Sequence, residues 1–311
     1  MWLALMIHGG GHTMSTRKDI RNDQTQILLK AGFLPVSVDY RLCPEVTLPD
    51  GPMRDACDAL FWARKVLPTL ALSRPDIRAD GDRVVTVGWS SGGHLALSLG
   101  WTVPSLGIRA PDAALVFYCP SDYEDPFWSR PNLPFSQKPV PPPATGYNHL
   151  YDGLFDKPVV GYSPAASLRG LGGWMSLDDP RARIVLHMNW EAKALHVLLN
   201  GLRRTGDSAS KRVTTPATPS IEQIRSVSPL AQIRAGSYRT PTFLIHGTGD
   251  DLIPWQQSQR THEALLEKGV RTELVVLKDL LHLFDMFRDF KRNADAVKAV
   301  NDGFEFLRAH V

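Results

Sequence analysis

Short apolar runs alternate with amphipathic segments near both ends of the chain. Apolar runs bounded by turn residues are typical of buried strands, whereas apolar positions repeating with the helical period are typical of helices. Strands are predicted over residues 2–7, 34–39, 83–87, 113–118, 242–246 and 273–277. Helices are predicted from an N-cap at Ser15 or Thr16 to Gly32, over residues 50–72, from Ser91 onward, before Gly269 and after Phe284. This alternation predicts an α/β fold in which helices cover both faces of a mostly parallel sheet.

The alternation stops at Pro120, and residues 121–224 are predicted to form an insertion into a core made of residues 1–120 and 225–311. The insertion contains a proline-rich stretch, residues 131–143, and a polar tract, residues 203–220, whose composition is typical of disordered segments. One amphipathic helix is predicted inside it, over residues 190–202 and ending near Gly206.

Composition and charge restrict the function classes. A chain of 311 residues is large for one domain but normal for an α/β sheet with an insertion. A net charge of +3 is small for this length and does not indicate a nucleic-acid partner. Three widely spaced cysteines predict neither a disulfide framework nor a zinc site. No run is long enough to span a membrane, and the apolar N-terminal run is too short for a signal peptide, so we expect a cytoplasmic protein.

Three short segments carry candidate chemistry, and each follows a predicted strand. They are the run HGGGH at residues 8–12, the run GWSSG at residues 88–92, and the pair Asp250 and His282. A G-x-S-x-G run between a strand and a helix is typical of the nucleophile elbow, and the order Ser, Asp, His is that of α/β-hydrolases. Because ligands bind at the carboxyl ends of parallel strands, we expect the three segments to meet there.

The residue types predict an acyl-transferring serine hydrolase. Ser90 is the candidate nucleophile, and a serine hydroxyl needs an adjacent base. We assign that role to His282, although its apolar neighbours also suit a histidine of the core. Asp250 is the candidate acid that orients the imidazole. Its spacing from the preceding His-Gly pair favours it over Asp251, which suits a loop or helix-capping carboxylate.

Glycines at the first segment predict an oxyanion hole. The backbone amides of Gly9, Gly10 and Ser91 are the candidate donors, and the alternative is a simple glycine turn. His8 and His12 have no third metal-ligand candidate nearby in sequence, so we predict no metal site. The dinucleotide fingerprint G-x-G-x-x-G is absent at these glycines, and no cofactor is predicted.

These segments, together with the run DYRLCPE at residues 39–45, resemble the hormone-sensitive-lipase-like branch of α/β-hydrolases. That branch usually has Asp before the serine and Ala after it, where this chain has Trp89 and Ser91. The motif sequences more closely resemble the C-terminal thioesterase-like domain of fungal non-reducing polyketide synthases that carry a C-methyltransferase. This resemblance implies thioester hydrolysis that releases an aromatic polyketide acid from an acyl carrier domain. It also implies that the chain is an excised domain, which suits its abrupt start in a strand.

Several alternatives share the same residues. The acyl-enzyme formed on Ser90 can be hydrolysed or captured by a substrate carbanion in a Claisen-type cyclisation. A free-standing carboxylesterase acting on small hydrophobic esters is the second function, and a catalytically silent binding module is the third. In each enzymatic case the insertion is predicted to act as a lid. Its aromatic residues are candidates for the acyl pocket: Tyr147, Tyr151, Phe155, Trp174 and Trp190.

Overall fold

A central parallel sheet organises the part of the chain that the computed structural model describes, residues 1–132, 146–164, 176, 178–206, 210–286 and 288–311. Its six strands follow the order β2-β1-β3-β4-β7-β8, and every neighbouring pair is parallel. The strands are β1 (Trp2–Ile7), β2 (Phe33–Val38), β3 (Asp80–Trp89), β4 (Ala114–Phe117), β7 (Thr242–Gly247) and β8 (Thr272–Leu277). The predicted α/β architecture is therefore confirmed.

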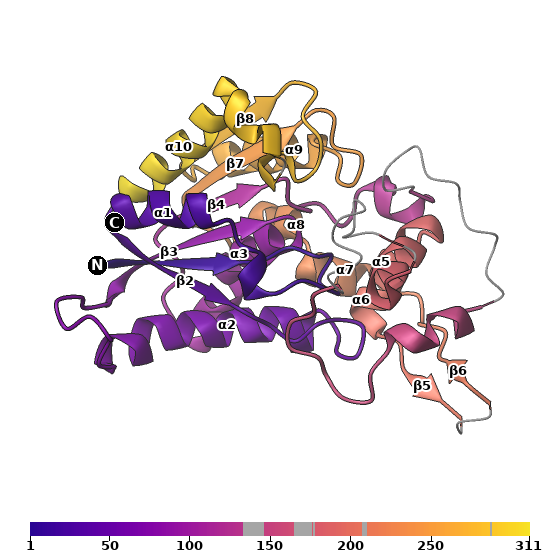
Figure 1. Cartoon of the computed structure of the whole chain (residues 1–311). Helices are drawn as coiled ribbons and strands as arrows, with labels where there is room; N and C mark the ends of the chain where they lie inside the picture. The colour runs from indigo at the N-terminus through magenta and orange to yellow at the C-terminus, as the bar shows by residue number, and fades with distance from the viewer. Residues whose placement is uncertain (133–145, 165–175, 177, 207–209, 287) are drawn as a thin grey trace.

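Helices cover both faces of this sheet. In β1, Leu3, Leu5 and Ile7 belong to one buried cluster, and Ala4 and Met6 belong to another. Such alternation follows from the two-residue side-chain period of a strand. The first face is covered by α2 (Arg54–Phe61), α3 (Ser91–Thr102), α8 (Pro229–Ala235) and α9 (Gln256–Glu267), and the second by α1 (Asn22–Lys30) and α10 (Ala294–Arg308). Figure 1 shows α10 and α2 on opposite sides of the strands.

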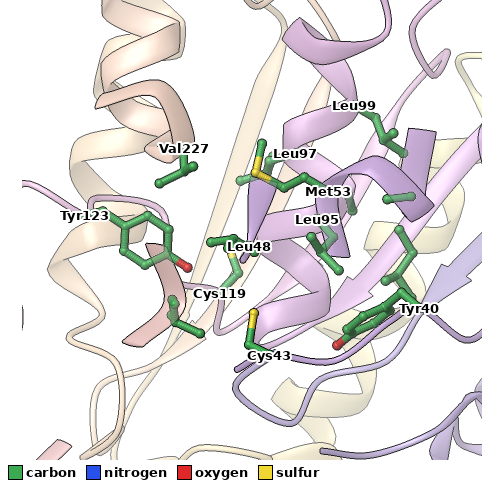
Figure 2. Packing of buried hydrophobic residues seen from close by; sticks show 14 of the residues in the cluster. Tyr40, Cys43, Leu48, Met53, Leu95, Leu97, Leu99, Cys119, Tyr123 and Val227 are labelled. Atoms are coloured by element: carbon green, nitrogen blue, oxygen red, sulfur yellow. The ribbon is translucent and has the colours of Figure 1, made fainter. Parts of the chain in front are cut away.

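Helix α3 is buried along most of its length. Leu95, Leu97 and Leu99 of α3 are each 0% exposed. Figure 2 shows them packed with side chains from the segment that follows β2 and with Val227 from the end of α7 (Ile221–Val227). Burial of a leucine side chain contributes about 1.5–3 kcal/mol. The turn that precedes α3 is therefore held on a rigid support.

The first helix of the chain is interrupted, in contrast to the prediction. Thr16 caps only a short 3₁₀ turn, Arg17–Asp19, through a capping box with Asp19. The backbone is extended at Ile20 and Arg21, and α1 begins after them. Gly32 does follow the helix end, with a φ of +92°.

The described residues of the insertion lie beyond the carboxyl ends of the strands (Figure 1). The helix predicted over residues 190–202 is wrong in its bounds, because two helices occupy this region. These are α5 (Pro180–Trp190) and α6 (Ala194–Asn200). Ala192 between them has a φ of +54°, which a continuous α-helix excludes. Asp179 caps the N-terminus of α5 directly before a proline, which is a start signal that the sequence analysis did not use.

The polar tract is ordered where it is described, so its predicted disorder is wrong for residues 203–206 and 210–220. The strands β5 (Arg204–Thr205) and β6 (Arg212–Val213) pair antiparallel. The Thr214 amide donates to the carbonyl of Arg203, and the Asn200 side chain donates to the carbonyl of Ala217. Most of the proline-rich stretch lies outside the described residues. Among the described helices, none is long and apolar enough to cross a membrane.

Candidate active site

Ser90 occupies a sharp turn between β3 and α3. Its φ of +52° and ψ of −126° are unusual for a residue with a side chain. Two glycines make room for this turn. A Cβ on Gly88 would lie 2.2 Å from the carbonyl oxygen of Gly92, and a Cβ on Gly92 would lie 2.1 Å from that of Ile7. The sequence pattern predicts this elbow for the same steric reason.

The three residues proposed as a triad lie in one hydrogen-bonded chain. His282 Nε2 is 3.0 Å from Ser90 Oγ. His282 Nδ1 is 2.7 Å from Asp250 Oδ2, so the Nδ1 hydrogen is donated to the carboxylate. The imidazole then presents its unprotonated Nε2 to the serine hydroxyl. This tautomer is the one that accepts a proton from a nucleophile.

The Asp250 carboxylate is fixed by further contacts. Its Oδ1 accepts the amides of Leu252 and Ile253, both at 2.9 Å. His246 Nε2 lies 3.0 Å from Asp250 Oδ2, and His246 is 0% exposed. Burial alone would raise the pKa of Asp250, but the imidazoles of His282 and His246 outweigh burial and hold this pKa well below its usual range. The carboxyl therefore stays ionised at neutral pH.

His246 is a site residue that the sequence pattern alone did not predict. It is the penultimate residue of β7, four positions before Asp250, and the turn between them folds the imidazole onto the carboxylate. Its Nδ1 lies 2.7 Å from Ser258 Oγ in α9. The available signal was its place at the end of a predicted strand, next to the acid that it contacts.

The glycine loop after β1 lies against Ser90. A Cβ on Gly9 would lie 3.1 Å from the Cβ of Ser90, and Gly10 has a φ of +102°. None of the hydrogen bonds found in the described residues engages the amides of Gly9, Gly10 or Ser91. Tyr40 braces the loop, because its hydroxyl donates to the carbonyl of His8 at 3.0 Å. Gly9, Gly10 and Ser91 line the same pocket as Ser90, and their role as oxyanion donors stays a prediction.

A buried histidine pair joins this loop to the elbow helix. His12 Nε2 lies 3.1 Å from His94 Nδ1, and His94 Nε2 donates to the carbonyl of Val227 at 2.8 Å. Burial lowers the pKa of His94 to about 4 and that of His12 well below its ordinary value. Both rings are therefore neutral at neutral pH and form a directed chain from the loop to α7. The described residues contain no group of three or more His, Cys, Asp or Glu placed to hold a metal.

A pocket of about 150 Å³, partly open to solvent, lies in front of Ser90 and His282. Its apolar lining comes from both the core and the insertion and includes Trp128, Val185, Met188, Leu198, Ile253 and Leu283. Its polar lining includes the glycine loop, residues 8–12, together with Ser90, Ser91 and His282. Such an enclosure suits an apolar acyl group attached at one polar end.

The structure corrects the predicted aromatic lining of this pocket. Four of the candidates are absent from its described walls: Tyr147, Tyr151, Phe155 and Trp190. Tyr151 lies under the guanidinium of Arg204 at 4.5 Å, and Phe155 is 44% exposed. These rings pack within the insertion, which contributes Trp128 and aliphatic and methionine side chains of α5 and α6 to the lining instead. Trp174 lies outside the described residues.

One arginine of the insertion is buried against the core. Arg181 in α5 is 0% exposed, and its guanidinium donates to Glu45 at 2.5 Å. It also donates to the carbonyls of Thr13, Cys43 and Gly153. These contacts fix the helix that forms one wall of the pocket to the loops around the glycine segment. The composition of the insertion did not indicate such an anchor.

Two family models match the chain. The model of the α/β hydrolase fold matches residues 4–145, and that of the prolyl oligopeptidase family matches residues 207–311. The chain has the α/β-hydrolase fold. It is 54% identical, over 99% of its length and 12% of the other protein, to the non-reducing polyketide synthase adrD of Penicillium rubens. It is 55% identical, over 99% of its length and 14% of the other protein, to the non-reducing polyketide synthase mapC' of Penicillium brevicompactum. The chain thus spans only a small part of these relatives.

Solved structures share the fold at low sequence identity. A Staphylococcus aureus protein of unknown function superposes with a TM-score of 0.63 and 17% identity, covering 99% of this chain and 89% of that one. An acetyl ester-xyloside bifunctional hydrolase from Caldicellulosiruptor lactoaceticus superposes with a TM-score of 0.59 and 18% identity, covering 98% and 82%. At this identity the likeness concerns the fold alone.

Proposed function

We propose that this chain is a thioesterase that releases an aromatic polyketide acid from an acyl carrier domain. The observation that carries the proposal is the chain of hydrogen bonds from Asp250 through His282 to Ser90, which ends at an apolar pocket. The choice of substrate is supported by the 54% identity to part of a non-reducing polyketide synthase. The carrier domain is the partner that such a substrate requires, and the cytoplasm is the predicted setting.

The proposed reaction proceeds through an acyl-enzyme. His282 Nε2 takes the proton from Ser90 as Oγ attacks the thioester carbonyl. The amides of Gly9, Gly10 and Ser91 stabilise the oxyanion, and loss of one such donor costs about 2.7–4 kcal/mol in comparable sites. The imidazolium returns its proton to the departing thiolate. Water, deprotonated by His282, then cleaves the ester and restores the Ser90 hydroxyl.

In this proposal residues 121–224 act as a lid that completes the acyl pocket. Val185 and Met188 of α5 and Leu198 of α6 form the wall opposite the core. The proposed boundary at residue 224 falls inside α7, because that helix continues to Val227. Its end accepts the hydrogen bond from His94, so the lid is joined directly to the elbow helix.

Substrate preference tests the proposal. Initial rates are measured on p-nitrophenyl acetate and butyrate and on small-thiol thioesters of substituted aromatic acids, with Ser90→Ala as the blank. The proposal predicts faster turnover of the aromatic thioesters, abolished in the blank. Fast cleavage of the short esters without a thioester preference would instead identify a general carboxylesterase. Turnover of neither class above the blank would identify a binding module.

A further inference from the structure

A buried carboxyl group lies three positions after the proposed base. Asp285 is 0% exposed and accepts three hydrogen bonds. The Tyr118 hydroxyl donates to Oδ1 at 2.5 Å, and Oδ2 accepts Gln24 Nε2 at 2.7 Å and Trp89 Nε1 at 3.1 Å. Burial of a carboxyl group is unfavourable unless hydrogen bonds compensate it, and these three donors do so.

The donors come from three elements that meet beside the site. Gln24 belongs to α1, Trp89 ends β3, and Tyr118 follows β4. Burial raises the pKa of Asp285, and the same three donors together with Arg21 oppose that rise. The network is separate from the contacts of Asp250, so the proposed triad does not account for it.

The network contacts the neighbours of both reacting groups. Trp89 directly precedes Ser90, and its indole replaces the aspartate that is usual in the hormone-sensitive-lipase-like branch. The ring of Tyr118 packs against the imidazole of His282, with centroids 4.7 Å apart. Leu283, between His282 and Asp285, has a φ of +61°, so the loop there is tightly bent. A single carboxyl group thus connects the loop of the base to the strand end of the nucleophile.

We infer that Asp285 is a positioning residue, whose carboxyl group sets the distance between His282 Nε2 and Ser90 Oγ by holding the base loop on Trp89 and Tyr118. This inference rests on the proposed function, because it concerns the same serine and histidine. It also gives a physical role to Trp89, which stands where the hormone-sensitive-lipase-like branch usually has an aspartate. The indole supplies a hydrogen-bond donor that an aspartate at this position lacks. A displacement of about 1 Å in such a pair lowers the rate about 100-fold.

Variants that each remove one donor test the inference without leaving a large cavity. Trp89→Phe and Tyr118→Phe keep a ring, and Gln24→Met keeps the side-chain length. Tyr238→Phe is the matched control, because the Tyr238 hydroxyl is also buried and hydrogen bonded, to Thr242 Oγ1 at 2.6 Å, just before the N-terminal end of β7 and away from the site. Melting temperature, kcat and KM are measured for each on p-nitrophenyl acetate and on an aromatic thioester.

We expect each donor variant to lower kcat about 10-fold on both substrates, and the double variant Trp89→Phe, Tyr118→Phe to lower it about 100-fold. KM should stay within about twofold of the parent, because positioning affects the reacting atoms and not the acyl group. Tyr238→Phe should lower only the melting temperature. Gln24→Met is informative because Gln24 is absent from the described pocket lining.

Two results would overturn the inference. One is unchanged kcat in folded donor variants, and the other is a change confined to KM for the bulky thioester, which would indicate a binding role. The proposed function has a separate control, since a parent protein no more active than Ser90→Ala would refute that function before the donor variants are compared.

Discussion

The buried arginine of the insertion allows a quantitative prediction. Arg181→Met keeps most of the side-chain volume but removes all five of its hydrogen bonds to the core and insertion. The Glu45 side chain, which is 5% exposed, then keeps the amide of Phe155 as the one donor to Oε1 among the described residues. Removal of one partner of a buried ion pair is more damaging than replacement of both, because the remaining charge stays buried.

The expected loss is large on the scale of folding stability. Breaking a buried pair from one side costs about 3–5 kcal/mol. For a chain of this size each kcal/mol lowers Tm by about 2–4 °C, which predicts a fall of about 6–20 °C. In the Arg181→Met background, Glu45→Gln removes the stranded charge. We expect this second change to recover roughly half of the loss, because an unsatisfied neutral group costs about 1–3 kcal/mol.

Thermal unfolding followed by circular dichroism measures these shifts. Arg74→Met is the matched control, since Arg74 pairs with Asp76 and their side chains are 71% and 59% exposed. Surface pairs of this kind contribute little, so the control should melt with the parent. Equal shifts for Arg181→Met and Arg74→Met would refute the reasoning. A double variant less stable than Arg181→Met alone would show that the stranded carboxylate is not the cause.

Three further predictions concern the site. Gly10→Ala should lower kcat about 100-fold or more and also lower the melting temperature, because the φ of +102° disfavours alanine and a Cβ would lie 2.1 Å from the carbonyl oxygen of Met14, which shifts the proposed oxyanion donor; steady-state kinetics below the melting temperature of the variant check this, and a parent-like kcat would contradict it. His246→Gln should lower kcat about 10-fold by loosening Asp250, and a parent-like kcat would count against that role. Burial lowers the pKa of His8 and of His94 to about 4, below the value of about 6.5 for an unfolded chain. Their contribution to stability is complete above about pH 6.5 and is lost as the pH falls toward 4, so unfolding midpoints should drop across this window; a flat profile contradicts the prediction.

The sheet could be predicted from the sequence because each strand is a short apolar run with a clear end. Parallel strands that are buried on both faces consist almost entirely of apolar residues. In β1, for example, alternate residues belong to two buried clusters on opposite faces of the sheet. The insertion was less predictable. The boundary between α5 and α6 depends on the positive φ of Ala192, and the pairing of β5 with β6 depends on contacts with residues far away in sequence.

The candidate site was likewise predictable only in part. Ser90, Asp250 and His282 each follow a strand, and the order of strands in the sheet brings such positions together. The supporting residues have no such local signal. Asp285 and Arg181 are ordinary charged residues in sequence, and their roles come from burial against partners more than a hundred positions away. The pocket lining was mispredicted for a related reason, since aromatic composition does not determine which face of the insertion is directed toward Ser90.

The most direct test of the central claim is the mass of the acyl-enzyme. The chain is mixed with an excess of a small-thiol thioester of an aromatic acid, quenched rapidly in acid, and measured as intact protein and as peptides. The account predicts that the protein gains the mass of the acyl group, that the gain maps to Ser90, and that Ser90→Ala shows none. Turnover without any adduct on Ser90, or an adduct on another residue that persists in Ser90→Ala, would contradict it.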